Sequence, residues 1–272
     1  DWARFILQKL QPDVVGITGS SGKTTTKEMV AAVLSRRHAV FANYGNYNDR
    51  YGLPIALGRL AAGHRVAVLE MACDGLDEIR DLAALTRPRV GIVTAVNDTH
   101  LAYLGSLEAI ALEKGRLVEA LPPAREGGMA ILNHDDAQVR AMAGRTRAHT
   151  ITYGLNPDAD LVAGNVRADE EGVSFTVFVK DFFPPSGHRR PAGRRKLRVR
   201  LALLGRHTVY AALAAVAAGL ALDVPLEEAL AALAALRPLP GRLNPLRGRG
   251  GIRLLDDSFN ASPASTLAAL DT

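Results

Sequence analysis

Residues 16–26 have the sequence GITGSSGKTTT, a glycine-rich stretch with a Gly-Lys-Thr triplet at 22–24. In the usual phosphate-binding loop, G-x-x-x-x-G-K-[ST], the first glycine stands five positions before the second, but this chain has Ile17 there. The preceding segment DVVGIT (13–18) predicts a buried strand, and KTTTKEMVAAVLSRR (23–37) has the spacing of a helix. Because amide groups at the start of a helix point at a bound anion, the stretch predicts a phosphate-binding loop of an unusual kind.

Short apolar segments alternate with amphipathic helical patterns from Asp13 to Tyr153. Further strands are expected at 38–42, 65–72, 89–96, 128–133 and 149–154. Helical spacing occurs between them at 53–62, 76–85, 106–121 and 136–144. Such alternation implies an α/β fold, with a mostly parallel P-loop-type sheet flanked by helices. Its ligand is expected at the carboxyl ends of the strands.

The pattern changes after Pro157, where expected strands follow one another without helices, at 160–168, 172–180 and 196–203. Helical patterns return at 205–222, 226–236 and 262–270, and a strand is expected at 251–257. We therefore divide the chain into a P-loop α/β core (13–153), a small antiparallel β excursion (158–204), and returning helices and strand (205–272).

Composition limits the class of protein. The 272 residues, 48% of them apolar, are enough for one large domain with a packed core. A single cysteine, Cys73, excludes a disulfide framework and indicates a reducing compartment. No segment resembles a signal peptide. The longest apolar run, 209–222, has fourteen residues, fewer than the ~20 that a membrane span needs. We expect a cytoplasmic protein without a membrane span.

The net charge of +5 comes from one local stretch. Seven of the 33 basic residues lie between Arg189 and Arg200, where no acidic residue stands, and without them the chain would carry a charge of −2. Such a run, flanked by proline and glycine, is typical of a solvated loop that continues into a strand. The charge therefore does not predict a nucleic-acid partner.

Three residues outside the loop could carry chemistry. Glu70 ends an apolar strand beside the phosphate loop, where Mg²⁺ takes oxygen ligands. His100 follows the strand at 89–96 and could bind a metal or orient a carboxylate. Lys114 lies on the next helix. Each also has an ordinary interpretation: a strand-end glutamate, a structural histidine and a solvated helix lysine.

Three motifs together resemble one family. GSSGKTTTKEM (19–29), GNYNDRYGLP (45–54) and LLDDSFNASPAS (254–265) resemble the Mur ligases, the ATP-dependent amide ligases of peptidoglycan precursor synthesis, in which the displaced first glycine is normal. Within the family they are most similar to the branch that adds D-alanyl-D-alanine to UDP-N-acetylmuramoyl-tripeptide. The resemblance implies that 1–272 is the central ATP-binding domain of a cytoplasmic enzyme, with the UDP-binding N-terminal and the C-terminal domains outside this chain. We expect the enzyme to be a monomer.

The resemblance implies a role for each matching residue. ATP is expected on the loop and on a closing motif, with contacts from Thr18, Gly19, Ser20, Ser21, Gly22, Lys23, Thr24, Thr25, His207, Asp257 and Asn260. Two Mg²⁺ ions are expected, one on Thr24 and one on Glu70 and His100, with Lys114 as a further ligand where it is carbamylated. The expected catalytic residues are Lys23, His100, Lys114 and Arg242, and the expected contacts to the muramoyl peptide are Asn46 and Asn48.

One motif departs from the family pattern. The helix on the adenine side usually has the sequence G-x-H-N-x-x-N, but here Gly205-Arg206-His207 is followed by Thr208 and, three positions later, by Ala211. Both asparagines are therefore replaced, and of this motif only His207 is retained as an expected ATP contact.

The implied reaction proceeds through an acyl phosphate, which the amine of D-alanyl-D-alanine then attacks. Two kinds of alternative remain open. A sister ligase of the Mur or folylpolyglutamate type would add a single amino acid, although the latter usually has G-K-G-S where this chain has GKTT at 22–25. A P-loop protein that uses ATP as a switch would form no amide bond at all.

Overall fold

Strand β1 (Asp13–Thr18) lies in the middle of a parallel sheet, and five of its six residues are buried. It pairs with β3 (Val66–Glu70) on one side and with β4 (Val90–Val93) on the other. The structure is a computed structural model that describes residues 2–99, 101–180 and 195–272. Apolar residues on both sides of β1 are what a strand covered by helices on both faces requires.

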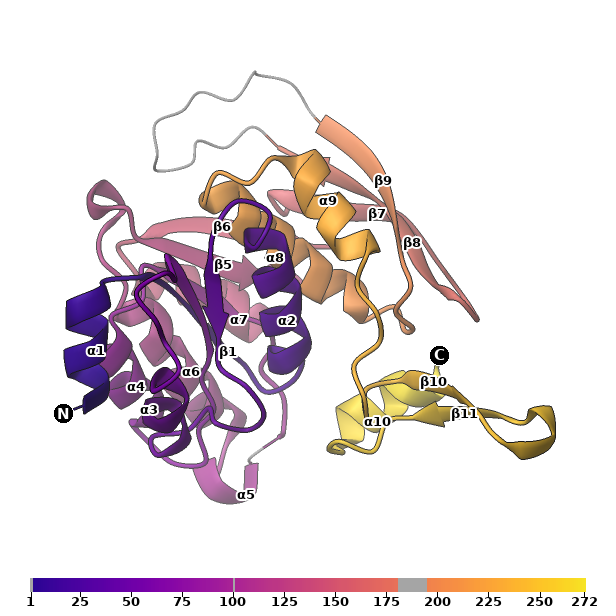
Figure 1. The fold of residues 1–272 in the computed structure, drawn as a ribbon, viewed down its shortest axis with the longest axis horizontal. Coiled ribbons are helices and arrows are strands. Elements are labelled where there is room, and N and C mark those ends of the chain that lie inside the picture. Colours follow the sequence, from indigo (N-terminus) through magenta and orange to yellow (C-terminus); the bar gives the residue numbers. More distant parts are fainter. Residues whose placement is uncertain (1, 100, 181–194) are drawn as a thin grey trace.

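The main sheet has nine strands in the order β2-β3-β1-β4-β5-β6-β7-β8-β9. The added parallel members are β2 (Val40–Ala42), β5 (Met129–Asn133) and β6 (His149–Gly154). The predicted α/β class and the mostly parallel sheet are therefore confirmed (Figure 1).

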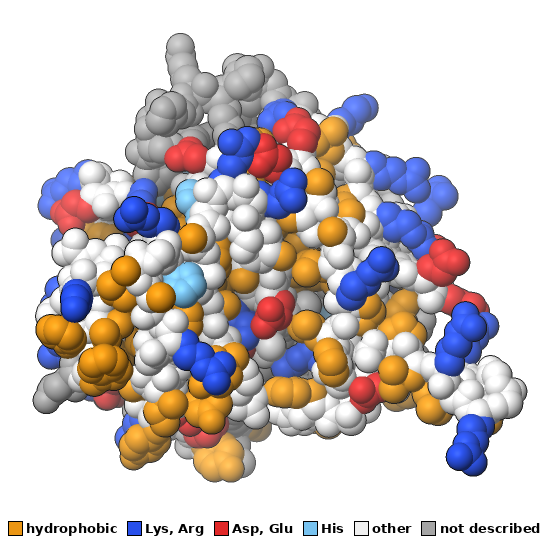
Figure 2. All heavy atoms as spheres, viewed as in Figure 1, with side chains coloured by type: hydrophobic (Ala, Val, Ile, Leu, Met, Phe, Trp, Pro, Cys, Tyr) orange, Lys and Arg blue, Asp and Glu red, His pale blue; other side chains and the backbone are white. Residues whose placement is uncertain are grey.

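The expected antiparallel strands continue this same sheet. Strand β7 (Leu161–Asp169) pairs in parallel with β6, and then β8 (Gly172–Val179) and β9 (Arg195–Leu201) pair antiparallel. The last residues of the basic run form β9, while Arg189, Arg190 and Arg194 lie outside the described residues. Figure 2 shows basic side chains over this side of the molecule, where Arg200 pairs with Asp169 at 2.7 Å.

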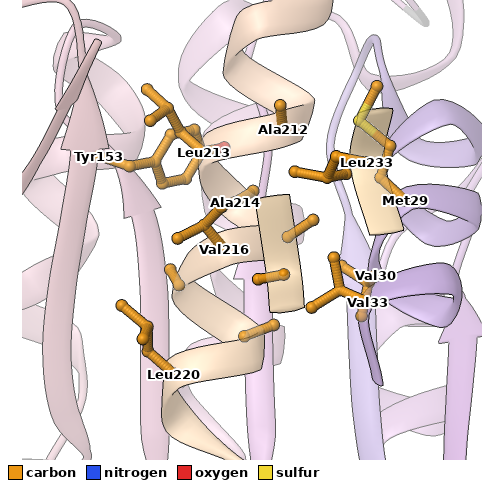
Figure 3. Close-up of a cluster of buried hydrophobic side chains, with 14 of the residues drawn as sticks. Met29, Val30, Val33, Tyr153, Ala212, Leu213, Ala214, Val216, Leu220 and Leu233 are labelled. Carbon is orange, nitrogen blue, oxygen red and sulfur yellow. The ribbon is translucent and has the colours of Figure 1, made fainter. Parts of the chain in front are cut away.

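One face of the sheet is covered by α2 (Lys23–Leu34), α8 (Thr208–Ala221) and α9 (Leu226–Ala234). Thirteen of the fourteen residues of α8 are buried, which explains its alanine content, because small side chains let it pack closely against neighbours on several sides. Figure 3 shows Val30 and Val33 of α2 on the side that faces this helix, and Met29 beside Leu233 of α9. This layer holds the helix that follows the glycine-rich loop firmly on the sheet.

The other face is covered by α1 (Trp2–Leu10), α3 (Gly52–Leu57), α4 (Glu78–Thr86), α6 (Leu107–Glu119) and α7 (Ala137–Ala141). The short helix α5 (Leu101–Leu104) precedes α6. Single 3-10 turns occur at η1 (Ala124–Glu126), η2 (Met142–Arg145) and η3 (Arg249–Gly251). Within the described ranges, no helix is long and apolar enough to cross a membrane.

The last elements form a separate small unit (Figure 1). Strands β10 (Asn244–Arg247) and β11 (Arg253–Asp256) pair antiparallel as a hairpin apart from the main sheet. Helix α10 (Pro263–Leu270) follows and starts in a capping box between Ser262 and Ser265. Strand β11 and helix α10 were expected from the sequence, whereas α1, α5 and β10 were not.

Candidate functional site

The candidate site begins where β1 ends. The loop at 19–22 connects β1 to α2 and uses positive φ angles at Gly19 (148°) and Gly22 (79°). A Cβ atom on Gly19 would lie 2.0 Å from the Thr94 hydroxyl oxygen, so only glycine fits there. Gly22 precedes α2 without a side-chain cap. The first amide groups of α2 are thus available to an anion.

Residues after β4 hold this loop in shape. The Ser20 amide donates to the Ala95 carbonyl at 2.7 Å, and the Thr94 hydroxyl donates to the Ser21 carbonyl at 2.6 Å. The Asn97 amide group donates to the Ser21 hydroxyl at 2.6 Å. Thr94 and Asn97 were not predicted as site residues, although polar residues directly after an apolar strand at this sheet edge were a usable signal.

Lys23 opens α2 and folds back over the loop. Its Nζ donates to the carbonyls of Gly19 at 2.8 Å and Ser20 at 3.3 Å. Burial, together with the positive charges of Lys114 and Arg242, lowers the pKa of Lys23 to about 8, although the charge of Glu70 opposes this shift. These cations therefore share one region, which suits a ligand with several negative charges.

The three threonines of the predicted phosphate loop differ in their hydrogen bonds and burial. The Thr18 hydroxyl donates to the Met71 carbonyl at 2.9 Å, which ties the end of β1 to the end of β3. The Thr24 hydroxyl accepts from the guanidinium of Arg242 at 2.9 Å. Thr25 lies half-buried in the first turn of α2. The predicted phosphate loop is thus assembled beside an arginine that lies far away in the sequence.

Glu70 ends β3 with a buried carboxylate, of which 3% is exposed. Its Oε1 accepts from the Asn48 amide group at 2.8 Å. Its Oε2 has no hydrogen-bond partner among the described residues. A buried carboxylate oxygen in that state is costly unless a cation or donor pairs with it. The interpretation of Glu70 as an ordinary strand-end residue therefore leaves this oxygen unexplained.

The oxygens present fit a magnesium ion. Mg²⁺ is commonly held by one or two protein oxygens together with waters and substrate phosphates, and Glu70 and Thr24 supply such oxygens. The described part of the chain contains no cluster of three or more His, Cys, Asp or Glu side chains that could hold a metal by itself. His100, the other expected ligand, lies outside the described residues.

Lys114 is completely buried on α6. Its Nζ lies 3.6 Å from the Cys73 sulfur, and burial raises the pKa of that thiol. The neighbouring Glu113 accepts from the amides of Asp77 at 2.7 Å and Ile79 at 2.8 Å, so it caps α4 and fixes α6 beside it. The interpretation of Lys114 as a solvated helix lysine is wrong, because a helix pattern alone does not tell which charged side chain points inward.

Arg242 directly precedes the hairpin unit, which consists of β10, β11 and α10, and connects it to the phosphate loop. Its guanidinium lies 4.2 Å from the centre of the Phe259 ring while it donates to Thr24. Burial lowers its pKa, and the negative charges of Glu70 and Asp257 oppose this shift. Asp257 also accepts from the Leu243 amide at 3.1 Å. Arg242 and Asp257 therefore belong to the same charged region as Lys23 and Glu70.

Three further predicted residues lie at its margin. His207 directly precedes α8, and desolvation lowers its pKa while the charge of Asp257 opposes this shift. The side chain of Asn260 accepts from the Ala261 amide at 2.8 Å and is exposed. Asn46 is exposed on the loop before α3, whereas Asn48 on that loop contacts Glu70.

The two residues of α8 that replace the asparagines of the family motif are both occupied within the protein. The Thr208 hydroxyl donates to the Gly205 carbonyl at 2.7 Å and is thereby used within its own turn. Ala211 is buried in the core. Neither position offers a side-chain amide to a ligand.

Comparisons with known proteins agree with this geometry. The sequence profile of the Mur ligase middle domain matches residues 17–219. The UDP-N-acetylmuramoyl-tripeptide–D-alanyl-D-alanine ligase of Bacillus subtilis is 33% identical over 270 residues, which are 98% of this chain and 54% of that protein. The chain thus spans about half the length of the curated relatives it matches.

Solved structures show the same relationship. A crystal structure of MurF from Acinetobacter baumannii has a TM-score of 0.88 and 28% identity, covering 99% of this chain and 56% of that one. MurF ligase from Thermotoga maritima, solved in complex with ADP, has a TM-score of 0.82 and 27% identity, with coverage of 99% and 58%. The chain belongs to the Mur ligase family.

Proposed function

We propose that this chain is the ATP-handling part of a ligase that joins D-alanyl-D-alanine to UDP-N-acetylmuramoyl-tripeptide and forms ADP and phosphate. The observation that carries the proposal is the convergence of Lys23, Lys114 and Arg242 beside the buried carboxylate of Glu70. Three cations next to a helix N-terminus suit a triphosphate. The names of the Bacillus subtilis relative and of the ADP complex from Thermotoga maritima support the same assignment.

The loop and Lys23 would bind the phosphates of ATP. Its glycines allow close approach of the backbone, and the uncapped amides at the start of α2 would donate to phosphate oxygens. Lys23 would exchange its two carbonyl partners for phosphate oxygens. The charge of the nucleotide would then offset the repulsion among Lys23, Lys114 and Arg242.

The proposed reaction has two steps. The terminal carboxylate of the tripeptide attacks the γ-phosphorus of ATP, the bond from that phosphorus to the bridging oxygen breaks, and ADP leaves. The amine of D-alanyl-D-alanine attacks the carbonyl of the acyl phosphate, the carbon–oxygen bond to phosphate breaks, and the amine loses a proton. The protein residues supply position and charge, and no protein nucleophile is needed.

Two side chains act on the transferred group in this proposal. Arg242, held by Phe259 and Thr24, would stabilise negative charge on the γ-phosphate. Lys114 would do so as an ammonium group or, once carbamylated, would serve as a buried anionic metal ligand. The candidate contacts to the muramoyl peptide are Asn46, which is exposed on the loop before α3, and Asn48, which contacts Glu70.

The residues that would hold Mg²⁺ are Thr24 and Glu70, with His100 as the further expected ligand. When bound, two such ions would neutralise charge on the phosphate oxygens. The unpartnered Oε2 of Glu70, considered within the described part of the chain, is the observation that supports this role.

The test is phosphate release by the protein at its natural length, supplied with ATP, Mg²⁺ and UDP-N-acetylmuramoyl-tripeptide. We expect release that depends on D-alanyl-D-alanine and is matched by formation of the amide product. Release with a single amino acid instead would assign the protein to a sister ligase. ATP hydrolysis without amide formation would support the switch function and contradict the proposal.

A further inference from the structure

Two asparagines from the loop after β2 surround Glu70. Asn48 donates to its carboxylate Oε1 at 2.8 Å. Asn43 contacts its peptide group: Oδ1 accepts from the Glu70 amide at 2.8 Å, and Nδ2 donates to the Glu70 carbonyl at 3.1 Å. The resemblance assigns Asn46 and Asn48 to the substrate.

We infer that Asn43 and Asn48 are positioning residues for Glu70, which fix its carboxylate so that Oε2 stays available to a divalent cation. The inference rests on the proposed function for the identity of that cation. It concerns how this chain prepares its ligand, since neither asparagine would contact the metal. Groups that hydrogen-bond a metal-binding side chain commonly set its orientation and affinity.

Asn43 extends the sheet with its side chain. Strand β2 ends at Ala42, and the Asn43 amide still reaches the Val68 carbonyl at 3.4 Å. Its side-chain amide then bonds both backbone groups of Glu70, the amide through Oδ1 and the carbonyl through Nδ2. Only a side chain with both a donor and an acceptor at this length makes both bonds, so Asn43 holds the Glu70 backbone in place.

Asn43 is in turn tied to the helix of the phosphate loop. The Nζ of Lys27, on the second turn of α2, donates to the Asn43 carbonyl at 2.6 Å. Lys27 is 2% exposed and forms an ion pair with Glu28 at 2.9 Å. A continuous set of buried polar contacts therefore joins the helix that begins at Lys23 to the backbone of Glu70. These contacts connect the phosphate-loop helix to the residue that carries the carboxylate.

Asn48 acts on the carboxylate itself. Its donation to Oε1 satisfies one oxygen and restricts rotation of the side chain, while Oε2 lacks a hydrogen-bond partner among the residues that the structure covers. The backbone of Asn48 is bonded independently, since its carbonyl accepts from the Ala72 amide at 2.9 Å. Replacing the side chain therefore leaves the loop attached and removes only the contact to Glu70.

The experiment measures cation binding without turnover. Mg²⁺ is titrated calorimetrically into the protein at its natural length, alone and with ADP, for wild type, Asn48→Ala and Asn48→Asp. We expect about 10- to 100-fold weaker Mg²⁺ binding in Asn48→Ala, as is usual when such a partner is lost. Asn48→Asp should orient Glu70 poorly too, because two carboxylates repel each other at this distance.

Asp49→Ala is the matched control. Asp49 lies on the same loop and accepts from the amides of Tyr51 at 2.8 Å and Gly52 at 2.6 Å, without contacting Glu70. Its loss should lower the unfolding temperature and leave Mg²⁺ affinity unchanged. A merely structural role for Asn48 would give the same result in both variants.

Three outcomes would overturn the inference. The first is absence of Mg²⁺ binding by the wild type, and the second is wild-type Mg²⁺ affinity in a folded Asn48→Ala variant. The third is an effect of Asn48→Ala confined to a higher KM for the peptide substrate, which would assign Asn48 to substrate binding. Asn48-dependent Mg²⁺ binding in a protein that forms no amide would support the inference while the proposed function fails. Amide formation with unchanged Mg²⁺ affinity in the variant would do the reverse.

Discussion

Lys23 is a cation held among other cations, and its protonation should couple to nucleotide binding. Burial and the charge of Lys114 lower its pKa to about 8. Bound phosphates would raise this pKa, so the complex holds the proton more tightly than the free protein does. The affinity for ADP is therefore highest below about pH 8 and falls as the pH rises above this value. We expect ADP binding about tenfold weaker at pH 9 than at pH 7.

Calorimetric titration of ADP at the two pH values measures this effect. Lys23→Arg is the control, because arginine keeps its charge throughout this range. The same pH dependence in Lys23→Arg would show that another group is responsible.

Lys23 should be essential for turnover and dispensable for folding. Among the described residues, its side-chain hydrogen bonds run to the carbonyls of Gly19 and Ser20 in its own loop, and it is partly exposed. We expect Lys23→Ala to abolish ATP turnover while the unfolding temperature stays within a few degrees of wild type. Lys9→Ala, an exposed lysine on α1, should keep full turnover. Wild-type turnover in a folded Lys23→Ala protein would remove the loop from the mechanism.

Individual residues were predictable from the sequence to different degrees. The loop residues follow from a contiguous motif, and Glu70 follows from its place at the end of a strand. The burial of Lys114 and the contact between Asn48 and Glu70 depend on the packing of α6 and on the path of the loop after β2. Neither is set by local spacing, so the solvated interpretation of Lys114 remained open until the fold was known.

At the scale of elements, the loop between β1 and α2 depends on two glycines for different reasons. Gly22 has φ 79° with nothing within 4 Å of an added Cβ, whereas at Gly19 a Cβ would meet Thr94 at 2.0 Å. We expect Gly22→Ala to cost about 1–2 kcal/mol of unfolding free energy from its backbone angle alone. Gly19→Ala should cost more and should weaken ADP binding, because the loop must move away from β4. Urea denaturation of both variants measures this, and equal costs would contradict the clash.

The predicted elements were those whose apolar pattern is set by burial on the main sheet. All parallel strands from β1 to β6 were expected, as were α2, α8 and α9. The missed β10 has four residues, begins with Asn244-Pro245 and is largely exposed. It is a strand only because β11 pairs with it, and such a partner leaves no periodic signal in the sequence.

At the scale of the whole molecule, the hairpin unit depends on few contacts with the main body. Strands β10 and β11 are mostly exposed, and side-chain contacts to the main body include the bond from Arg242 to Thr24 and an exposed ion pair between Arg253 and Glu170. A nucleotide on the loop would give Arg242 a phosphate partner and so increase the attachment of the unit. Exchange of its backbone amides should therefore slow when ADP and Mg²⁺ bind.

Hydrogen–deuterium exchange over 241–260, with and without ADP and Mg²⁺, tests this prediction. The protection should be lost in Arg242→Ala and kept in Arg247→Ala, which removes an exposed arginine of the same hairpin. Strands β7 and β8 provide an internal reference, because they belong to the main sheet and pack against α8. Equal slowing in those strands would indicate a general stabilisation of the protein by the nucleotide. Slowing confined to 241–260 and dependent on Arg242 would show that this guanidinium strengthens the attachment of the hairpin when phosphates are bound.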